Sequence, residues 1–398
     1  MVPAAWLVTF ALSAIPAASP AGITPASTEG PPVRSGLDVL VAQKFAMLKG
    51  ARIGLLTHAP GRDVRGQRGL DLLAAAPHVD LRRVFTPEHG LSSSFEGKLA
   101  DGLDESSGMA LVSLYGDNRR PTPEQLADLD LVVIDLQGAG VRFYTYATTM
   151  GYMLEACAQA QVPVMVLDRP NPLGGRLVEG PSADEDRLSF IAYRPVPVVH
   201  GMTMGELARL YRDHFGVSVS LAVVSMQGWK RSMRFEDTGL PWYAPSPNLR
   251  NPTQAYLYPG IGLLEATDLS VGRGTDEPFE RIGAPWVDGV RLARALDAAG
   301  IPGLRFTPIE FTPDASKHEG QLCGGVQLRL DDLDALHPVA AGLAIARIVE
   351  RLFPEPFDEA KVDERLMSRA AFATWLDGKP MGQPNSAFLE ARARALLY

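Results

Sequence analysis

The sequence is poor in cysteine, since its 398 residues include only Cys157 and Cys323. Two isolated thiols provide neither a disulfide framework nor a zinc knuckle, and we interpret both as buried structural residues. Positive charge is also in the minority: 38 Lys and Arg residues stand against 46 Asp and Glu residues, which gives a net charge of -8. A nucleic-acid footprint needs clustered excess Lys and Arg, so we expect no nucleic acid among the partners.

Several well-known catalytic signatures are absent. The sequence contains no G-x-S-x-G elbow, no H-E-x-x-H pair and no Walker A loop, because Glu96-Gly97-Lys98 lacks the earlier glycine at the required spacing. Gly272-Arg273-Gly274 neither follows a predicted strand nor opens a helix, which excludes a dinucleotide fingerprint. We therefore expect no cofactor and no bound metal.

Long hydrophobic runs are missing as well, and no segment of the mature chain is predicted to span a membrane. The one unusual stretch is the N-terminus, where residues 1–19 carry no charged side chain and an apolar run at 4–15 precedes small residues. This pattern is typical of a secretory signal, so we predict a signal peptide at residues 1–21 and export to the periplasm or the medium. Residues 22–35, rich in Pro and Ser, are predicted to be an unstructured lead.

What the sequence does contain is a regular alternation of apolar strand runs and amphipathic helices. Strands are predicted at residues 53–57, 81–85, 110–115, 131–136, 162–167 and 217–224, and helices near 70–76, 148–161 and 203–215. A further helix is predicted to begin at Pro123, because Thr122 and Gln125 have the spacing of a capping box. Strands that are apolar throughout belong to a parallel sheet covered on both faces. We predict an α/β fold in which residues 36–240 form a Rossmann-like, doubly wound domain with a largely parallel sheet.

The remaining residues, 241–398, are predicted to form a smaller α+β domain that completes a cleft. Residues 241–260, rich in Pro, Asn and Tyr, suggest a long ordered loop near a site. Helices are predicted at 290–299, 338–352 and 386–397, and strands near 304–311 and 325–330.

Ligands of open parallel sheets bind beyond the carboxyl ends of the strands, where loops and helix N-termini converge. Glu88 follows the second predicted strand on a short turn from Pro87 to Gly90 and is the leading catalytic candidate. Burial of such a carboxyl group raises its pKa, so that it can donate a proton near neutral pH. The alternative is that Glu88 caps the next element, and His89 beside it is equally well explained as a packed residue.

Two further groups follow later strands of the predicted sheet. Asp168, Arg169 and Asn171 lie on a turn stiffened by two prolines, which can serve a ligand or simply hold the loop by an ion pair. Arg142, with Tyr144 and Tyr146, supplies a forked donor and aromatic faces that suit sugars and carboxylates, although either tyrosine also fits the core.

Loops farther along the chain add more candidates. Glu179, His200, Asn248, Glu265, Arg273 and Thr275 lie in polar, glycine-rich or proline-rich segments. Thr203 and Glu206, which follow His200, are better explained as the capping box of the next helix.

Ten short segments, in order from about residue 36 to the C-terminus, resemble the family of exo-acting β-N-acetylmuramidases, formerly a bacterial domain family of unknown function. The segments are Pro87-Glu88-His89-Gly90, Ser113-Leu114-Tyr115-Gly116, Arg142-Phe143-Tyr144-Thr145-Tyr146, Asp168-Arg169-Pro170-Asn171-Pro172, Val178-Glu179-Gly180-Pro181, His200-Gly201-Met202-Thr203, Ser246-Pro247-Asn248, Ser270-Val271-Gly272-Arg273-Gly274-Thr275, Pro278-Phe279-Glu280 and Cys323-Gly324-Gly325-Val326. Two departures concern the sugar subsite: Ala266 and Asp268 replace the Gly and Asn of an EGTN-type loop, and Gly138-Ala139-Gly140 replaces a bulkier stretch.

The resemblance implies a glycoside hydrolase that releases N-acetylmuramic acid from the non-reducing end of peptidoglycan fragments, with Glu88 as general acid/base. The second catalytic group is left open among Glu179, Glu265, Asp168 and Glu280, or the N-acetyl group of the substrate itself. The lactyl carboxylate of the sugar calls for an arginine, such as Arg142, Arg169 or Arg273. The full candidate set is catalytic Glu88, His89 and Asp168, and substrate-binding Arg142, Tyr144, Tyr146, Arg169, Asn171, Glu179, His200, Asn248, Glu265, Arg273 and Thr275.

Two other functions fit the same residues. A non-catalytic periplasmic protein that binds sugars or muropeptides would use the aromatic and arginine side chains but would not need Glu88. A metal-dependent hydrolase would require His58, His89 and His200, which are distant in sequence, to meet in space. No feature of the sequence sets the oligomeric state.

Overall fold

The computed structural model describes residues 33–92, 101–382 and 384–398. The predicted signal peptide and residues 22–32 of the predicted lead lie outside the described residues. Residues 33–35 belong to the fold, which corrects the predicted start at residue 36. Val33 is buried and its N–H donates to the Thr238 carbonyl at 2.9 Å. Ser35 forms a capping box with Asp38 at the start of α1 (Gly36–Ala42).

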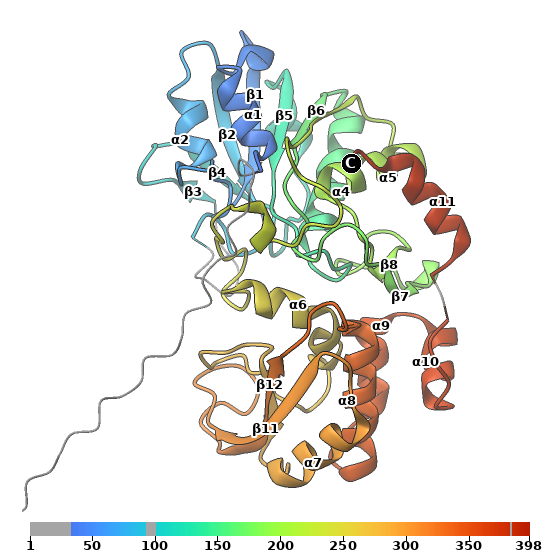
Figure 1. Ribbon diagram of the computed structural model, residues 1–398. Helices are drawn as coiled ribbons and strands as arrows, with labels where there is room; N and C mark the ends of the chain where they lie inside the picture. The colour runs from blue at the N-terminus through green and yellow to red at the C-terminus, as the bar shows by residue number, and fades with distance from the viewer. Residues whose placement is uncertain (1–32, 93–100, 383) are drawn as a thin grey trace, which may run out of the picture.

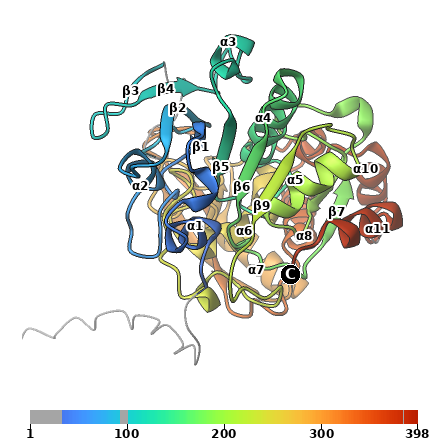
Figure 2. The same cartoon turned by 90° about the horizontal axis from the view of Figure 1, so that it is seen from above.

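A seven-stranded sheet forms the centre of the first domain (Figure 2). Its strand order is β3 (Gly102–Leu103), β4 (Ala110–Ser113), β2 (Asp80–Thr86), β1 (Arg52–Thr57), β5 (Leu131–Asp135), β6 (Val164–Leu167) and β9 (Leu221–Val224). All neighbouring strands are parallel except the short edge strand β3, which is antiparallel to β4. The predicted largely parallel, doubly wound sheet is confirmed.

Both faces of this sheet are covered by helices, which explains the apolar strands. On one face Val133 of β5 joins a core cluster with α1 and α2 (Gly69–Ala74). On the other face the adjacent Val132 and Ile134 pack in a cluster with α4 (Tyr146–Ala160) and α5 (Met204–Asp213). Alternate side chains of a strand point to opposite faces, so a strand buried on both sides has to be apolar throughout.

The second domain contains a three-stranded antiparallel sheet in the order β10 (Arg281–Ala284), β12 (Cys323–Leu330) and β11 (Leu304–Phe311). Helices α7 (Gly289–Ala299) and α8 (Pro338–Leu352) accompany it in the lower half of Figure 1. The predicted smaller α+β domain is therefore confirmed, and β10 is a strand that the sequence pattern did not indicate.

Residues 241–260 are only partly the loop that was predicted, because their second half forms α6 (Pro252–Ile261). Asn251 caps this helix by accepting a hydrogen bond from the Gln254 N–H at 2.9 Å, and Pro252 occupies the first helical position. Proline at the first helical position loses no hydrogen bond, so a Pro-rich segment that was predicted as a loop can begin a helix. In Figure 1, α6 lies between the two sheets, and it packs against α8.

The remaining elements connect the two domains and close the fold. They are the hairpin β7 (Glu179–Ser182) and β8 (Pro197–Val199), the short helices α3 (Pro123–Leu126), α9 (Asp363–Leu366) and α10 (Arg369–Leu376), the C-terminal helix α11 (Ser386–Ala395), and five 3-10 turns at Ala46–Leu48, Glu185–Arg187, Glu236–Thr238, Gly262–Leu264 and Glu359–Val362. The predicted capping box of Thr122 and Gln125 is present at the start of α3.

The chain does not stay in the second domain to its end, because α11 packs against α5 of the first domain (Figure 1). A single core cluster also runs from Val132 of the parallel sheet to Val326 and Ile345 of the second domain. The two domains therefore share one hydrophobic core.

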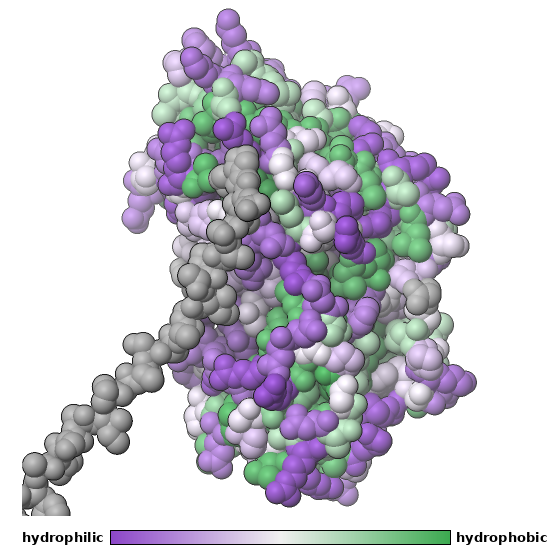
Figure 3. Space-filling model, in the orientation of Figure 1, coloured by the Kyte–Doolittle hydropathy of each residue, from purple (hydrophilic) through white to green (hydrophobic). Residues whose placement is uncertain are grey.

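The surface carries no extended apolar face in the view of Figure 3, where green and purple residues alternate over both halves. Exposed large hydrophobic residues such as Met47, Leu103 and Leu322 lie in separate segments of the chain. Among the residues that the structure describes, no helix has both the length and the apolar character needed to cross a bilayer.

Candidate active site

A cavity of about 370 Å³ is lined by residues of both domains. The first domain contributes Glu88 after β2, Tyr115 after β4 and Thr145 before α4, which are loops at the carboxyl ends of parallel strands. The second part of the chain contributes charged and aromatic side chains from widely separated positions. The other lining residues are His89, Phe143, Tyr144, Phe190, Ile191, Ser246, Leu249, Tyr258, Glu265, Arg273, Phe279 and Arg365.

Glu88 is half-buried and held on a tight turn. The Gly90 N–H donates to the Pro87 carbonyl at 3.1 Å, and both His89 and Gly90 have positive φ angles, of 69° and 61°. The Thr145 hydroxyl donates to the Glu88 carboxylate at 2.7 Å. The turn therefore presents this carboxyl group to the cavity in a fixed orientation, and its predicted location at a strand end matches the structure.

Two tyrosines support the Glu88 turn. The hydroxyl of Tyr115 is hydrogen-bonded to the Glu88 carboxylate, and burial together with this bond raises the pKa of Tyr115 to about 12. Tyr146 is fully buried, and its hydroxyl oxygen lies 2.9 Å from the Glu88 carbonyl oxygen and 2.8 Å from that of Pro245. Tyr146, predicted to bind the sugar, instead fixes the backbone of the turn, whereas Tyr144 does line the cavity.

The cavity also has a charged wall, formed by Glu265, Arg273 and Arg365. The Glu265 carboxylate lies 2.8 Å from Nη2 of Arg273 and 3.8 Å from Nη2 of Arg365. Tyr258 is buried beside these groups, and burial raises its pKa above the usual range, with Glu265 adding to the effect. Glu265 and Arg273 were predicted site residues, and the structure brings both into the cavity with Glu88.

Arg142 does not face the cavity, which corrects its predicted role in binding the substrate. Its side chain is buried, and its guanidinium donates to four backbone carbonyls, those of Pro181 at 2.8 Å, Val196 at 3.1 Å, Arg365 at 2.9 Å and Leu366 at 2.8 Å. A guanidinium with that many fixed acceptors connects the hairpin β7–β8 to α9.

Asp168 is also structural, which corrects its prediction as a catalytic residue. Its carboxylate is fully buried and accepts hydrogen bonds from the Thr203 hydroxyl at 2.7 Å, the Gly205 N–H at 2.8 Å and the Tyr398 hydroxyl at 2.8 Å. Burial raises the pKa of Asp168 to about 6, against the effect of these donors. The side chain thus joins three separate segments and does not line the Glu88 cavity.

Its neighbours on the same turn have similar functions. Arg169 forms a buried ion pair with Asp135 at 2.5 Å. An ion pair therefore holds this loop, which is the alternative that the sequence left open. The Asn171 amide donates to the Met202 carbonyl at 3.0 Å, and its side-chain oxygen accepts from the Leu173 N–H at 3.0 Å. Neither side chain reaches the lining of the Glu88 cavity, where the predicted substrate contacts would have placed both.

Glu179 and His200 lie elsewhere too. The Glu179 carboxylate accepts the backbone N–H groups of Val339 at 3.2 Å and Ala340 at 2.9 Å, at the N-terminus of α8. His200 is buried, its Nδ1 accepts the Met202 N–H at 3.1 Å, and burial lowers the pKa of its imidazole to about 3. Glu179 therefore caps a helix, and His200 holds a loop as a neutral hydrogen-bond acceptor, which corrects both predictions.

Asn248 and Thr275 support segments that border the cavity without lining it. The Asn248 N–H donates to the hydroxyl of Ser246, a lining residue, at 3.3 Å. The Thr275 hydroxyl donates to the Gly272 carbonyl at 2.6 Å, which closes the turn that carries Arg273. Their predicted direct contact with substrate is replaced by an indirect role, while the predicted capping box of Thr203 and Glu206 is confirmed.

The histidines do not form the ligand set of a metallohydrolase. Nε2 of His58 accepts the Gln137 N–H at 2.8 Å, and burial lowers the pKa of His58 well below its usual value. His200 is similarly occupied at Nδ1. In the part of the chain that the structure describes, no three His, Cys, Asp or Glu side chains converge as metal ligands, which contradicts the metal-dependent alternative.

Of the described lining residues, ten were not among the predicted site residues, and Tyr115, Thr145, Tyr258 and Arg365 are four of these. Tyr115 and Thr145 follow strand ends, so the strand-end rule could have included them. Tyr258 lies in the helix that was predicted as a loop, and Arg365 lies on the four-residue helix α9. No local signal marks Arg365, because its position depends on contacts between domains.

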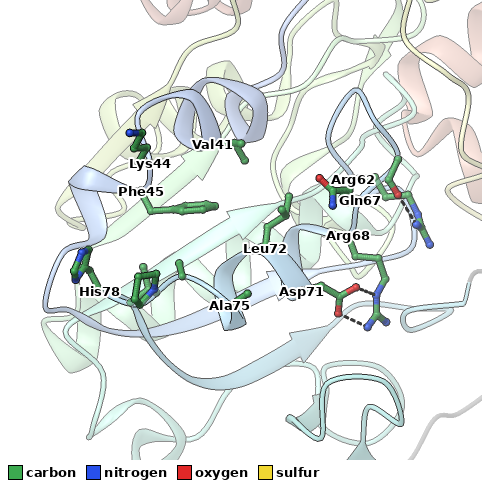
Figure 4. Close-up of a pocket in the computed structure, with 14 residues that line it drawn as sticks. Val41, Lys44, Phe45, Arg62, Gln67, Arg68, Asp71, Leu72, Ala75 and His78 are labelled. Carbon is green, nitrogen blue, oxygen red and sulfur yellow. Dashed lines mark hydrogen bonds and ion pairs between the residues drawn. The ribbon is translucent and has the colours of Figure 1, made fainter.

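A larger hollow of about 950 Å³ lies between α1 and α2 (Figure 4). Figure 4 shows Phe45 and Leu72 in its middle and the ion pair of Arg68 with Asp71 at one end, where Arg68 Nε lies 2.8 Å from the carboxylate. None of the predicted site residues lines this hollow. Its one acidic lining residue is already paired, so the cavity at Glu88 is the better candidate for catalysis.

Comparison with known proteins gives the family. The N-terminal model of exo-β-N-acetylmuramidase NamZ matches residues 53–253, and the C-terminal model matches residues 256–398. The chain belongs to the NamZ family. A relative from Bacillus subtilis strain 168, peptidoglycan β-N-acetylmuramidase NamZ, is 42% identical over 330 residues, which cover 82% of this chain and 80% of the relative.

The fold of this NamZ family member is also found in solved structures. Two DUF1343 family proteins from Bacteroides fragilis NCTC 9343 match it with TM-scores of 0.83 and 0.74 and sequence identities of 33% and 26%. Each match covers 92% of this chain and 99% of the solved chain. Both domains of the NamZ architecture are therefore present here in the same order.

Proposed function

We propose that this protein is an exo-β-N-acetylmuramidase that releases N-acetylmuramic acid from the non-reducing end of peptidoglycan fragments. The relative from Bacillus subtilis is named for that activity on peptidoglycan. The observation that carries the proposal here is the position of Glu88, which lines a cavity between domains and is held by the Thr145 hydroxyl at 2.7 Å. A non-catalytic binding protein would have no need for a carboxyl group held in this way.

In this mechanism Glu88 acts as the general acid and donates its proton to the glycosidic oxygen as the bond to the anomeric carbon breaks. Tyr115 and Thr145 orient the carboxyl group from two different loops. The positive charge that develops on the sugar ring needs a second group to stabilise it. His89, beside Glu88 in the lining, is positioned to contact the sugar but has no separate step here.

Of the four carboxylates considered for that second group, only Glu265 lines the cavity. Asp168 and Glu179 are engaged with backbone and hydroxyl donors away from it. Glu280 accepts the side-chain amides of Asn251 and Gln254, both at 3.0 Å. Glu265 and the substrate's own N-acetyl group are therefore the two candidates.

The test is the substitution Glu88→Gln, assayed with a chromogenic β-N-acetylmuramide. We expect kcat to fall by about two to four orders of magnitude, since a positioned general acid contributes that much. Binding of the sugar, measured by calorimetry, should persist in the variant. Thr145→Val keeps the carboxyl group but removes one hydrogen bond, so a loss of about tenfold is expected.

The matched control is Glu319→Gln, which changes an exposed glutamate outside the cavity and should leave kcat as it is. Full turnover by the Glu88→Gln variant would remove Glu88 from the mechanism. Binding without turnover by the wild-type protein would instead favour the non-catalytic muropeptide-binding protein.

We also propose that the protein is exported to the periplasm or the medium. The support is the uncharged, apolar character of residues 1–19, followed by small residues. Fractionation of cells that express the full chain or a variant without residues 2–21 tests the proposal. The full chain should be found outside the cytoplasm and the shortened chain inside, and equal distribution of the two would contradict export.

A further inference from the structure

The charged wall of the cavity contains more positive than negative charge. Glu265 is nearly buried, with 8% of its side chain exposed, and it lies between Arg273 and Arg365, which retain 36% and 28% exposure. One carboxylate cannot neutralise two guanidinium groups, so this wall carries a net charge of about +1 while Glu265 is ionised.

Arg365 is less tightly paired with Glu265 than Arg273 is. Its Nη2 lies 3.8 Å from Glu265, which is a looser contact than the 2.8 Å between Arg273 and the same carboxylate. Its buried Nε has no hydrogen-bond partner within the described residues. A guanidinium in this state can bind a carboxylate of the right geometry with two parallel hydrogen bonds.

We propose that Arg365, together with Arg273, forms a subsite that recognises the carboxylate of an acidic terminal sugar. Glu265 serves there as the internal counter-ion that holds the two guanidinium groups side by side. The inference rests on the proposed function, because the acidic group is then the lactyl carboxylate of N-acetylmuramic acid. It assigns the choice between acidic and neutral sugars to these arginines rather than to Glu88.

The electrostatic balance of the whole cavity agrees with this assignment. Apart from its tyrosines, which raised pKa values keep neutral, its ionisable side chains are the acids Glu88 and Glu265, the arginines Arg273 and Arg365, and His89. When Glu88 carries the proton that it donates as an acid and His89 is neutral, the lining has a net charge of +1. A monoanionic sugar brings that total to zero, whereas a neutral sugar leaves a positive charge uncompensated.

Arg142 is the positioning residue of this subsite. Its Nη2 donates to the carbonyls of Arg365 at 2.9 Å and Leu366 at 2.8 Å, while its Nη1 donates to Pro181 at 2.8 Å in the hairpin of the first domain. This guanidinium therefore fixes the backbone that carries Arg365 relative to the domain that carries Glu88. It does so without touching the cavity.

The experiment compares three 4-nitrophenyl β-glycosides: N-acetylmuramic acid, the same sugar with its lactyl group as the carboxamide, and N-acetylglucosamine. The measured quantity is the ratio of kcat/KM for the acid to kcat/KM for the carboxamide. For the wild-type protein we expect a ratio of about tenfold to a hundredfold, since a charge-assisted bidentate contact is lost with the amide.

Arg365→Gln should bring this ratio close to one, and Arg365→Lys should recover part of it because the charge remains. Arg142→Met should lower the ratio as well, through displacement of α9. Arg305→Gln is the matched control: Arg305 is exposed, lies outside the lining and pairs with Asp331 at 2.6 Å, so the ratio should not change.

If the Arg365→Gln variant keeps the wild-type ratio, the subsite is refuted. If the Arg142→Met variant keeps it, the positioning role of Arg142 is refuted. Equal loss on the acid and the carboxamide, with no recovery by Arg365→Lys, would also overturn recognition of the carboxylate. If the wild-type protein cleaves none of the three glycosides, the proposed function fails instead, so the two failures are distinct.

Discussion

At the scale of single residues, the polar side chains divide into those that line the cavity and those that hold its loops. Arg142 looks like a ligand-binding arginine in the sequence, yet its guanidinium donates to four carbonyls. A buried charged group without partners is very costly, so a buried arginine in a crowded loop region collects acceptors from the backbone. The same reasoning explains Asp168, whose carboxylate accepts hydrogen bonds from four donors.

His200 gives a prediction about pH at this scale. Burial lowers the pKa of His200 from 6.5 to about 3. Because the folded state disfavours the charged imidazole, the stability that His200 contributes is complete above pH 6.5 and is lost as the pH falls toward 3. We expect the free energy of unfolding to fall by at most about 1.4 kcal/mol per pH unit from this residue in that window.

The measurement is urea unfolding of the wild type and of His200→Asn between pH 4 and pH 7. Asp168 acts in the opposite direction, since its raised pKa of about 6 means that its contribution is lost as the pH rises from 3.8 to 6. The difference between wild type and variant cancels that contribution. The exposed His78→Asn is the control, and an equal pH slope in all three proteins would contradict the prediction for His200.

At the scale of elements, the second domain depends on a close crossing of α6 and α8. A Cβ atom at Gly260 would lie 2.0 Å from the Pro338 carbonyl oxygen, and one at Gly342 would lie 2.3 Å from the Gly260 carbonyl oxygen. These are backbone contacts, which cannot move aside as a flexible side chain can. The two helices can pack at this distance only because both positions are glycine.

Gly260→Ala should therefore destabilise the protein by about 1–3 kcal/mol or more, since added atoms in a packed crossing force the helices apart. The helix preference of alanine opposes this by about 1 kcal/mol and does not outweigh the clash. Thermal and urea unfolding measure the change. Gly102→Ala is the matched control, because no atom lies within 4 Å of its added Cβ, and equal stability of both variants would refute the role of the crossing.

The elements also show where local patterns were sufficient. The capping boxes at Thr122 and Thr203 use side chains within three residues of each other, so their motifs predicted both helix starts correctly. Glu179 caps α8 from a distance of 160 and 161 residues along the chain. Its partner is not in the neighbouring sequence, and so its polar loop was mistaken for a substrate contact.

At the scale of the whole molecule, the cavity exists because the two domains share one hydrophobic core and are held together by two sets of hydrogen bonds. Arg142 fixes α9 to the hairpin of the first domain. At the C-terminus, the Tyr398 hydroxyl donates to Asp168 at 2.8 Å and the Met226 N–H donates to the same hydroxyl oxygen at 2.8 Å. Together these contacts limit how far Arg365 and Glu265 can move relative to Glu88.

The sequence by itself determined the parallel sheet, the smaller α+β domain, and the location of Glu88 at a strand end. Apolar strands and capping boxes are local features, because periodicity and hydrogen bonds between near neighbours leave a direct record in the order of residues. The ten family-like segments added the correct family for the same reason.

Only the tertiary structure decided which polar residues meet in the cavity. Arg365, Tyr258 and Glu265 reach Glu88 through contacts between residues far apart in sequence, while Arg142, Asp168 and His200 turn into the interior. Whether a polar side chain serves the substrate or the fold depends on which partners surround it after folding. Burial and partner geometry are properties of the packed chain, and no local pattern encodes them.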